Sequence, residues 1–202
     1  MNSFYRRQKW IEENFVEIRE SAEVVLDLKY STLDNFMKTD VYGGFSRCFL
    51  SPLAANMFAE TCKDLRRRHS HLQFHVWDAL RPRSVQARFY DHLKDTPFRD
   101  YVAAPHPGSL HNFGMALDLT LQTRDGRLLD MGTDFDHFGD LSQPKLEKQF
   151  LASGTLTPLQ LENRLLLRSL LEGQGFTVLE HEWWHFNALA KDQVYGKHVI
   201  LE

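Results

Sequence analysis

The stretch EHEWWHF, residues 180–186, contains the pattern H-E-x-x-H and raises the question of whether this segment is a helix or a strand. In a helix, residues i and i+4 lie on one face, so His181 and His185 would share a metal ion with Glu182 beside them. If the segment is not helical, the two histidines need not share a face, and the ligands of any metal must be sought elsewhere. The conformation of this stretch therefore decides between two kinds of fold.

The surroundings of the stretch favour a strand. Residues 176–180, FTVLE, alternate between apolar and polar side chains and lead directly into it without a helix-capping signal. The stretch itself is rich in bulky aromatic residues, which are poor helix formers. A helical site would also need a third ligand downstream, where the candidates His198 and Glu202 both lie near the end of the chain. We therefore predict that Glu182 and His185 lie at the end of a strand and that His181 is dispensable.

Two helices have start signals in the sequence. Ser51 with Pro52, and Thr157 with Pro158, combine a capping residue with proline at the first helical position, and Gln160 completes a capping box. We therefore predict helices over 51–68 and 157–175. The other predicted elements are an amphipathic helix or irregular arm over 4–22, strands over 72–80 and 114–123, a helix over 84–93 and a hairpin loop over 123–128. Helices and strands that are separated in this way indicate an α+β fold.

Length and composition bound the class of protein. A chain of 202 residues, 43% hydrophobic and 25% charged, is within the range of one domain with one core. Its net charge of -3 supplies no basic surface for phosphates, so a nucleic-acid partner is not expected. The N-terminus has no apolar leader segment and no apolar run reaches transmembrane length, so we expect a cytoplasmic protein without membrane association. The sequence does not indicate an oligomeric state.

A second segment, GSLHNFGMALDLTL at 108–121, contains candidate metal ligands. His111 precedes a predicted strand, and Asp118 lies within that strand among apolar neighbours. A buried carboxylate is costly unless it is paired with a cation or bound to a metal. On this segment alone, a salt-bridged Asp118 with a surface His111 explains the pattern as well as a metal site does. With His185 added, two imidazoles and one carboxylate leave an open fourth position on zinc, which is the composition of a catalytic rather than a structural site.

Six blocks follow one another along the chain in a characteristic order: KYSTLDNF (29–36), WDALRP (77–82), SLHNFGMALDLTL (109–121), MGTDFD (131–136), NRLLLRSLLEGQGF (163–176) and EWWHF (182–186). With these blocks, the chain from about residue 28 to residue 190 resembles the zinc D-alanyl-D-alanine dipeptidases of the VanX type, within a wider group of D,D-carboxypeptidases and hedgehog-like zinc domains. The resemblance implies a single domain whose small, mainly antiparallel central sheet is flanked by helices and carries the zinc site. Residues 28–202 would form the dipeptidase domain, and residues 1–27 an N-terminal helix or arm of the same domain.

The resemblance also implies roles for individual residues. His111, Asp118 and His185 would bind one zinc ion, and Glu182 would act as the general base. Arg81 would polarise the scissile carbonyl and stabilise the oxyanion. The implied substrate-binding residues are Ser109 for the carboxylate, Asp136 for the ammonium group, and Tyr30 and Asp78 with less specific roles. The implied activity is the zinc-dependent hydrolysis of the free dipeptide D-Ala-D-Ala to two D-alanines.

Elementary chemistry agrees with these implied roles. Zinc lowers the pKa of a bound water towards neutrality, and a carboxylate such as Glu182 can take its proton and pass it to the leaving amine. Arg81 keeps its charge at any working pH, and a fixed charge stabilises a developing oxyanion. A site that binds both ends of a free dipeptide leaves a longer chain with an unpaired buried charge, which costs roughly 2–5 kcal/mol.

The sequence departs from the family pattern beside the first histidine ligand. Family members commonly have Ser-Arg-Gly there, whereas this chain has Asn112-Phe113-Gly114, with an aromatic residue in place of a cation. This exchange would change the polarity near the site and the efficiency or exact substrate, but not the metal ligands.

Several alternatives stay open at this stage. Taken singly, Arg81 would fit a surface ion pair and Asp136 a turn cap. A D,D-carboxypeptidase would lack an equivalent of Asp136, and a non-catalytic zinc module would have less need for Arg81, Ser109 and Asp136. A non-haem iron site usually has a tighter spacing of its histidine and aspartate than His111 and Asp118. Whether the reaction serves dipeptide salvage or glycopeptide resistance is not indicated by the residues.

Overall fold

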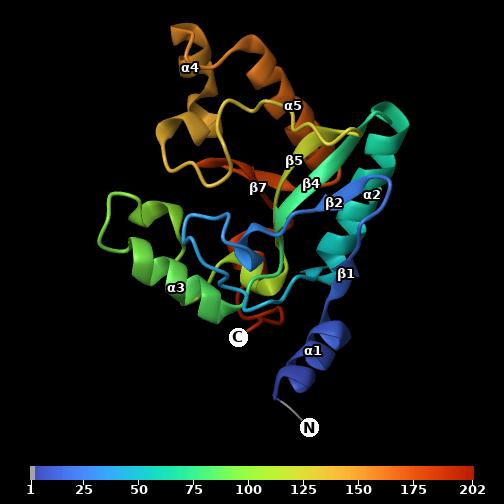
Figure 1. Ribbon diagram of the computed structural model, residues 1–202, viewed down its shortest axis with the longest axis vertical. Coiled ribbons are helices and arrows are strands. Elements are labelled where there is room, and N and C mark those ends of the chain that lie inside the picture. Colours follow the sequence, from blue (N-terminus) through green and yellow to red (C-terminus); the bar gives the residue numbers. More distant parts are fainter. Residues whose placement is uncertain (1–2) are drawn as a thin grey trace.

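The core of the protein is a five-stranded sheet, mainly antiparallel as predicted. The computed structural model describes the backbone of residues 3–202 and the side chains of residues 7–202. The strands follow the order β2 (Val24–Leu26), β4 (Leu72–Asp78), β5 (Ala116–Thr123), β7 (Glu182–Asn187) and β6 (Thr177–Leu179) (Figure 1). β2 and β4 run parallel, and every other neighbouring pair is antiparallel. The expected α+β class is confirmed.

The stretch 180–186 is not a helix. β6 and β7 form an antiparallel hairpin in which Val178 pairs with Phe186 and Leu179 with Glu182. Residues 180 and 181 form the turn between these strands. The strand prediction is therefore correct for 182–186, but the expectation of one uninterrupted strand is wrong, and Glu182 begins β7 instead of lying near the end of a strand.

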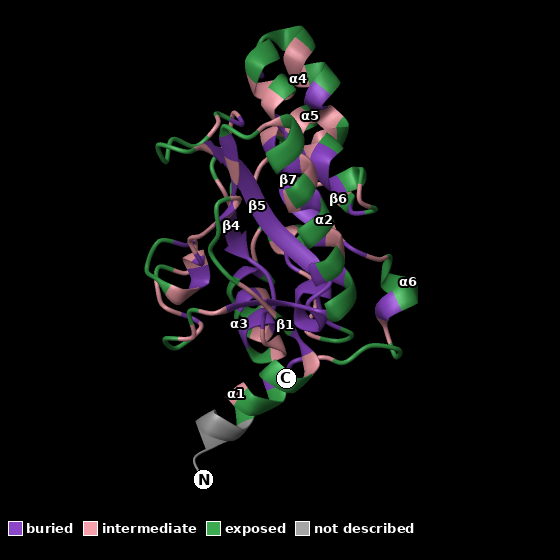
Figure 2. Ribbon diagram, turned by 90° about the vertical axis from the view of Figure 1, so that its right-hand side faces the viewer, coloured by how far each residue is buried: buried purple, intermediate pink, exposed green. Residues whose placement is uncertain are grey.

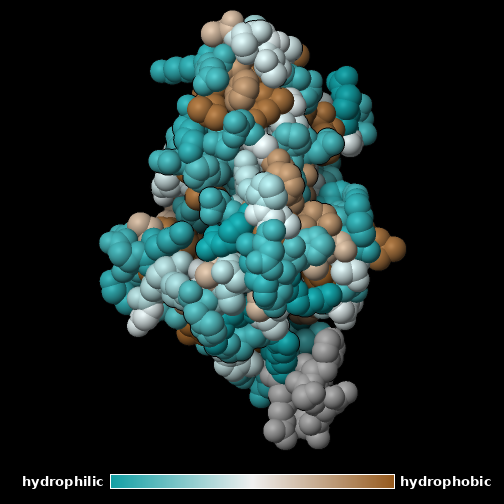
Figure 3. All heavy atoms as spheres, turned by 90° about the vertical axis from the view of Figure 1, so that its left-hand side faces the viewer, coloured by the Kyte–Doolittle hydropathy of each residue, from teal (hydrophilic) through white to brown (hydrophobic). Residues whose placement is uncertain are grey.

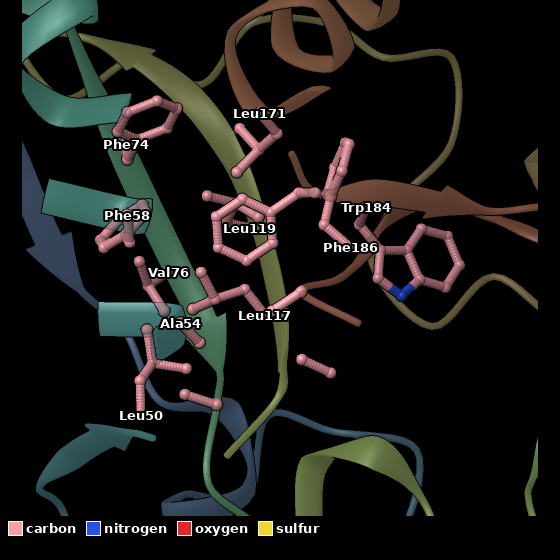
Figure 4. Packing of buried hydrophobic residues seen from close by; sticks show 14 of the residues in the cluster. Leu50, Ala54, Phe58, Phe74, Val76, Leu117, Leu119, Leu171, Trp184 and Phe186 are labelled. Atoms are coloured by element: carbon pink, nitrogen blue, oxygen red, sulfur yellow. The ribbon is translucent and has the colours of Figure 1, made fainter. Parts of the chain in front are cut away.

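The sheet buries one face against two helices with the predicted start signals. α2 (Pro52–Arg68) begins after Ser51, whose Oγ accepts a hydrogen bond from Ala54 N at 3.2 Å, and α5 (Pro158–Glu172) begins with the Thr157–Gln160 capping box. α2 ends at Arg68, as predicted, whereas α5 ends at Glu172, three residues before the predicted end at 175. Figure 4 shows the apolar side chains that meet between them and the sheet: Ala54, Phe58, Phe74, Val76, Leu117, Leu119, Leu171 and Phe186.

β5 is the centre of this arrangement, because it is buried from Ala116 to Gln122 (Figure 2). α3 (Arg83–Leu93) lies on a different side of β4 from α2 and packs in a second apolar cluster with Tyr30 and Val41 (Figure 1). The hairpin loop predicted at 123–128 is a tight turn. After it, the chain pairs with β5 through one isolated antiparallel β-bridge, between Gln122 and Leu128.

Short elements complete the fold. The helix or arm predicted over 4–22 is shorter: α1 (Ser3–Asn14) ends at Asn14, and a strand follows it. The remaining elements are β1 (Val16–Ile18), β3 (Cys48–Leu50), α4 (Glu147–Ser153), α6 (Lys191–Val194) and the 3-10 helices η1 (Lys29–Ser31), η2 (Arg99–Tyr101), η3 (Leu110–Phe113), η4 (Asp140–Ser142) and η5 (Pro144–Leu146). The face in Figure 3 is mainly hydrophilic, with its apolar side chains in small separate groups. Within residues 3–202, the helices are too short or too polar to cross a bilayer.

An ion pair joins the N-terminal strand to the body of the domain. β1 pairs antiparallel with β3, and Glu17 accepts hydrogen bonds from Arg47 Nε at 2.8 Å and Nη2 at 2.9 Å. These bonds from Arg47 lower the pKa of Glu17 from 4.5 to about 2. The ionised form is therefore the one that stabilises the fold.

We expect Glu17→Gln to lower the free energy of unfolding by about 1 kcal/mol at neutral pH. Because the folded-state pKa is depressed, the contribution is fully present above pH 4.5 and is lost as the pH falls towards 2. Urea unfolding of both proteins at several pH values measures the difference. A difference that stays constant down to the lowest pH would contradict the ion-pair explanation.

Candidate metal centre and its pocket

Three segments far apart in the sequence bring two histidines and an aspartate together. His111 lies on η3, Asp118 on β5 and His185 on β7, where Asp118 and His185 are direct partners across the two strands. All three residues are buried, and one potential ligand atom from each lies within 4.8 Å of the others. The structure thus assembles the residues that the sequence assigned to a metal, without the helix that H-E-x-x-H would require.

Hydrogen bonds fix which ring nitrogens face this centre. His111 Nδ1 lies 2.7 Å from Ala79 O, and His185 Nε2 lies 2.8 Å from Asn187 Oδ1, so each of these nitrogens carries the proton and donates it. The opposite nitrogens, His111 Nε2 and His185 Nδ1, then present lone pairs to each other at 3.1 Å. Lone pairs in this arrangement repel unless a proton or a metal cation lies between them. Neutral imidazoles oriented by a second hydrogen bond are typical metal ligands.

Asp118 completes the donor set. Its Oδ2 lies 3.3 Å from His111 Nε2, and its Oδ1 lies 3.0 Å from His185 Nδ1. Within residues 7–202, Oδ1 has no hydrogen-bond donor although it is buried. Burial alone would raise the pKa of Asp118, but His111 and His185, when protonated, hold it well below the usual value, so a positive charge at this centre keeps the carboxylate ionised. An ionised carboxylate without a donor, beside two imidazole lone pairs, fits a divalent cation with room for a further ligand.

Glu182 lies beside this centre, whereas His181 does not. Glu182 Oε2 is 3.6 Å from His185 Nδ1, and burial raises the pKa of Glu182 to about 8. His181 is in the turn before β7, where its Nδ1 is 3.2 Å from Lys145 Nζ at the surface. The residue that completes the H-E-x-x-H pattern thus lies outside the centre.

Arg81 is held rigidly at the edge of the centre. Its Nε and Nη2 donate to Asp78 Oδ2 at 2.9 and 2.7 Å, and its Nη1 donates to Gln86 Oε1 at 2.9 Å. Nη2 is also 3.5 Å from Asp118 Oδ2. The side chain is 9% exposed, so the alternative of a surface ion pair is wrong.

Asp78 has a supporting position. It was grouped with the substrate-binding residues in the sequence-based prediction, but it does not line the pocket. Its other oxygen, Oδ1, accepts a hydrogen bond from Tyr42 OH. With both oxygens bound by protein groups, Asp78 holds Arg81 in place. Its second partner, Tyr42, is distant in the chain, so short-range sequence patterns do not reveal this contact.

The pocket above the centre is small, with a volume of about 90 Å³. Among the predicted residues, those that line it are Tyr30, Arg81, Ser109, His111, Asp118, Asp136, Glu182 and His185. Aromatic and apolar side chains, including Phe36, Phe89 and Trp184, form the rest of its wall. The size and the mixture of charged and apolar groups suit a small polar ligand.

Asp136 is a half-buried carboxylate, and within residues 7–202 no cation lies within 4.0 Å of it. Tyr30 OH lies 3.0 Å from each of its oxygens, and burial, aided by the charge of Asp118, raises the pKa of Asp136 to about 8. Its backbone is in the left-handed region, with φ of 58°, which few residues other than glycine adopt readily. Because Asp136 binds Tyr30 and faces the pocket, the alternative of a turn cap does not describe it.

The segment that carries Asp136 is fastened by buried side chains that sequence analysis did not single out. Arg164 Nε on α5 donates to Met131 O at 2.7 Å, and Trp183 Nε1 on β7 donates to Thr133 Oγ1 at 2.7 Å. Arg164 lies within a block that the sequence presents only as a helix. Arg164 is only 1% exposed, and the sequence of the helix does not indicate that this arginine is buried.

The departure at Asn112-Phe113 does not place an aromatic ring in the pocket. Asn112 Oδ1 accepts from Ser109 N at 2.8 Å, and Asn112 Nδ2 donates to Arg81 O at 2.9 Å, so Asn112 ties two site segments together. Phe113 does not line the pocket and packs against Tyr195, with ring centroids 5.6 Å apart. The expected change of polarity beside the metal centre is therefore smaller than the sequence suggested.

An α+β fold with a His/Asp/His donor set, a neighbouring glutamate and a buried arginine defines a metallopeptidase. The family model described as D-ala-D-ala dipeptidase matches residues 12–200, and the chain belongs to this family. It is 33% identical over 164 residues to the D-alanyl-D-alanine dipeptidase of Escherichia coli K12, covering 81% of this chain and 78% of that protein. The D-alanyl-D-alanine dipeptidase of Enterococcus faecium is 28% identical over 188 residues, covering 84% and 87%. The family resemblance of the sequence blocks is confirmed.

Proposed function

We propose that the protein hydrolyses the free dipeptide D-Ala-D-Ala to two D-alanines with one zinc ion held by His111, Asp118 and His185. The observation that carries this proposal is the close approach of two buried imidazole nitrogens, 3.1 Å apart, beside the carboxylate of Asp118. Two imidazoles and one carboxylate with an open position match catalytic zinc. In this proposal, residues 1–27 belong to the same domain as residues 28–202.

Bound zinc would act as a Lewis acid that polarises the peptide carbonyl and acidifies the attacking water. Glu182 takes the proton from this water and delivers it to the leaving amine, because its carboxylate lies beside the centre and its raised pKa suits a group that both accepts and donates a proton. Arg81 stabilises the oxyanion that develops on the carbonyl. Asp78 and Gln86 already hold its guanidinium in place, so no reorganisation is needed during the reaction.

The two ends of the substrate have separate partners. Asp136 and Tyr30 bind the ammonium group, because a half-buried carboxylate whose pKa is raised gains most from an incoming cation. Ser109 binds the carboxylate: its Oγ accepts from His111 N at 3.3 Å, which leaves the hydroxyl proton for the ligand. A peptide acylated at its amino end would leave Asp136 without its cation, which favours a dipeptidase over a carboxypeptidase.

The test of this proposal compares three substrates with and without a chelator. We expect release of alanine from D-Ala-D-Ala, very little from L-Ala-L-Ala or an N-acyl-D-Ala-D-Ala peptide, and none from any of them after chelation. Addition of zinc should restore the activity. Release of alanine only from the acylated peptide would show a carboxypeptidase instead. No release of alanine from any of the three substrates would favour a non-catalytic zinc module.

A further inference from the structure

Two cations line the pocket, and only one of them is already bound by protein groups. Arg81 gives three of its five N–H donors to Asp78 and Gln86. Lys191, the first residue of α6, is exposed, and within residues 7–202 its ammonium group makes no ion pair within 4.0 Å and no hydrogen bond. Lys191 is thus the cation of this pocket that has no protein partner within residues 7–202.

The position of Lys191 is set by the docking of its segment onto the loop before His111. Val194, on the same short helix, is completely buried. Tyr195 OH donates to Gly108 O at 2.8 Å, and its ring packs against Phe113. These contacts attach the segment of Lys191 to Gly108, just before Ser109, and to Phe113, a few residues after it. The side chains of Lys191 and Ser109 therefore line the same pocket.

Ser109 by itself is a weak partner for a carboxylate. Its hydroxyl offers one neutral donor, whereas a carboxylate has two oxygens that accept several hydrogen bonds. The pocket also holds the carboxyl groups of Asp118, Asp136 and Glu182, and an ionised carboxylate repels an anion. A hydrogen bond from a charged donor is about twice as strong as one from a neutral donor.

We propose that Lys191 binds the carboxylate of the dipeptide together with Ser109 and so selects peptides with a free, ionised C-terminus. This inference rests on the proposed dipeptidase function and names a further specificity-determining residue for it. Asp136 and Lys191 then read the opposite charges of the two substrate ends. Because Lys191 is exposed, its charge can be removed with little effect on folding.

The experiment compares D-Ala-D-Ala with its C-terminal amide, which keeps the ammonium group but has no anionic end. We expect Lys191→Met to raise KM for D-Ala-D-Ala about 3- to 10-fold and to leave kcat within about twofold. The reason is that the ion pair contributes equally to binding of the substrate and of the transition state. KM for the amide should be unchanged, and Lys191→Arg should restore the wild-type KM for the acid. The matched control is Lys197→Met, which removes an exposed lysine of the same segment whose Nζ binds Asp192 O.

An equal rise in KM for both substrates would show a general disturbance of the pocket, and no rise for either would show that Lys191 does not bind the carboxylate; both outcomes overturn the inference. Either result leaves the dipeptidase proposal standing if the wild-type enzyme hydrolyses D-Ala-D-Ala. Calorimetric titration of D-Ala-D-Ala into zinc-loaded Glu182→Gln separates binding from turnover. If wild type does not hydrolyse the dipeptide and this variant does not bind it, both proposals are wrong.

Discussion

Glu182→Gln is expected to reduce kcat for D-Ala-D-Ala by about 10³-fold and to leave the zinc content of the protein unchanged. The amide has nearly the shape of the carboxylate but cannot accept the proton of the attacking water, and proton transfer by a positioned side chain typically contributes 10²–10⁴-fold. Zinc should stay bound because His111, Asp118 and His185 keep their positions and their hydrogen bonds. Steady-state kinetics and metal analysis of the purified variant measure the two quantities.

The matched control for this variant is Glu180→Gln. Glu180 lies two residues earlier, in the turn before β7, and is exposed, so its replacement removes a carboxylate without changing the centre. This control should keep the wild-type kcat. A Glu182→Gln protein that retains most of its kcat would exclude Glu182 as the proton acceptor, and one that loses zinc would make Glu182 a ligand instead.

The helices and strands around the site were predictable because their signals are local. Ser51 and Thr157 accept hydrogen bonds from backbone groups three residues on, so the cap and its partner occur together in the sequence. The alternation of leucines with polar residues over 114–123 likewise corresponds to two faces of β5. The structure agrees with the sequence wherever a pattern is complete within a few neighbouring residues.

The turn before β7 and the contacts that support the site were not predictable in this way. Glu180 and His181 are not residues that favour turns, and the turn forms because Leu179 and Glu182 pair across the hairpin. Other supports join residues remote in sequence, such as Asp78 to Tyr42. Such tertiary pairs leave no periodic signal, so the sequence indicated which residues gather at the centre but not what holds them.

Exchange of the two histidines of H-E-x-x-H for alanine, one at a time, is expected to give opposite results. His185→Ala removes one of the three ligand atoms that lie within 4.8 Å of one another, so zinc affinity should fall by at least about 100-fold and activity should be lost. His181→Ala alters a turn residue that contacts Lys145, and both zinc content and kcat should stay at wild-type values.

Thermal unfolding with and without zinc distinguishes loss of metal from loss of fold in this comparison. A ligand that binds only the folded state raises Tm more the more tightly it binds, so zinc should raise the Tm of wild type and His181→Ala equally and that of His185→Ala very little. Each variant is compared with its own metal-free state, so a lower starting Tm of His185→Ala, caused by the loss of a buried side chain, does not affect the comparison. If zinc instead stabilises His185→Ala and fails to stabilise His181→Ala, the ligands are those of a helical H-E-x-x-H site and the strand-borne centre is wrong.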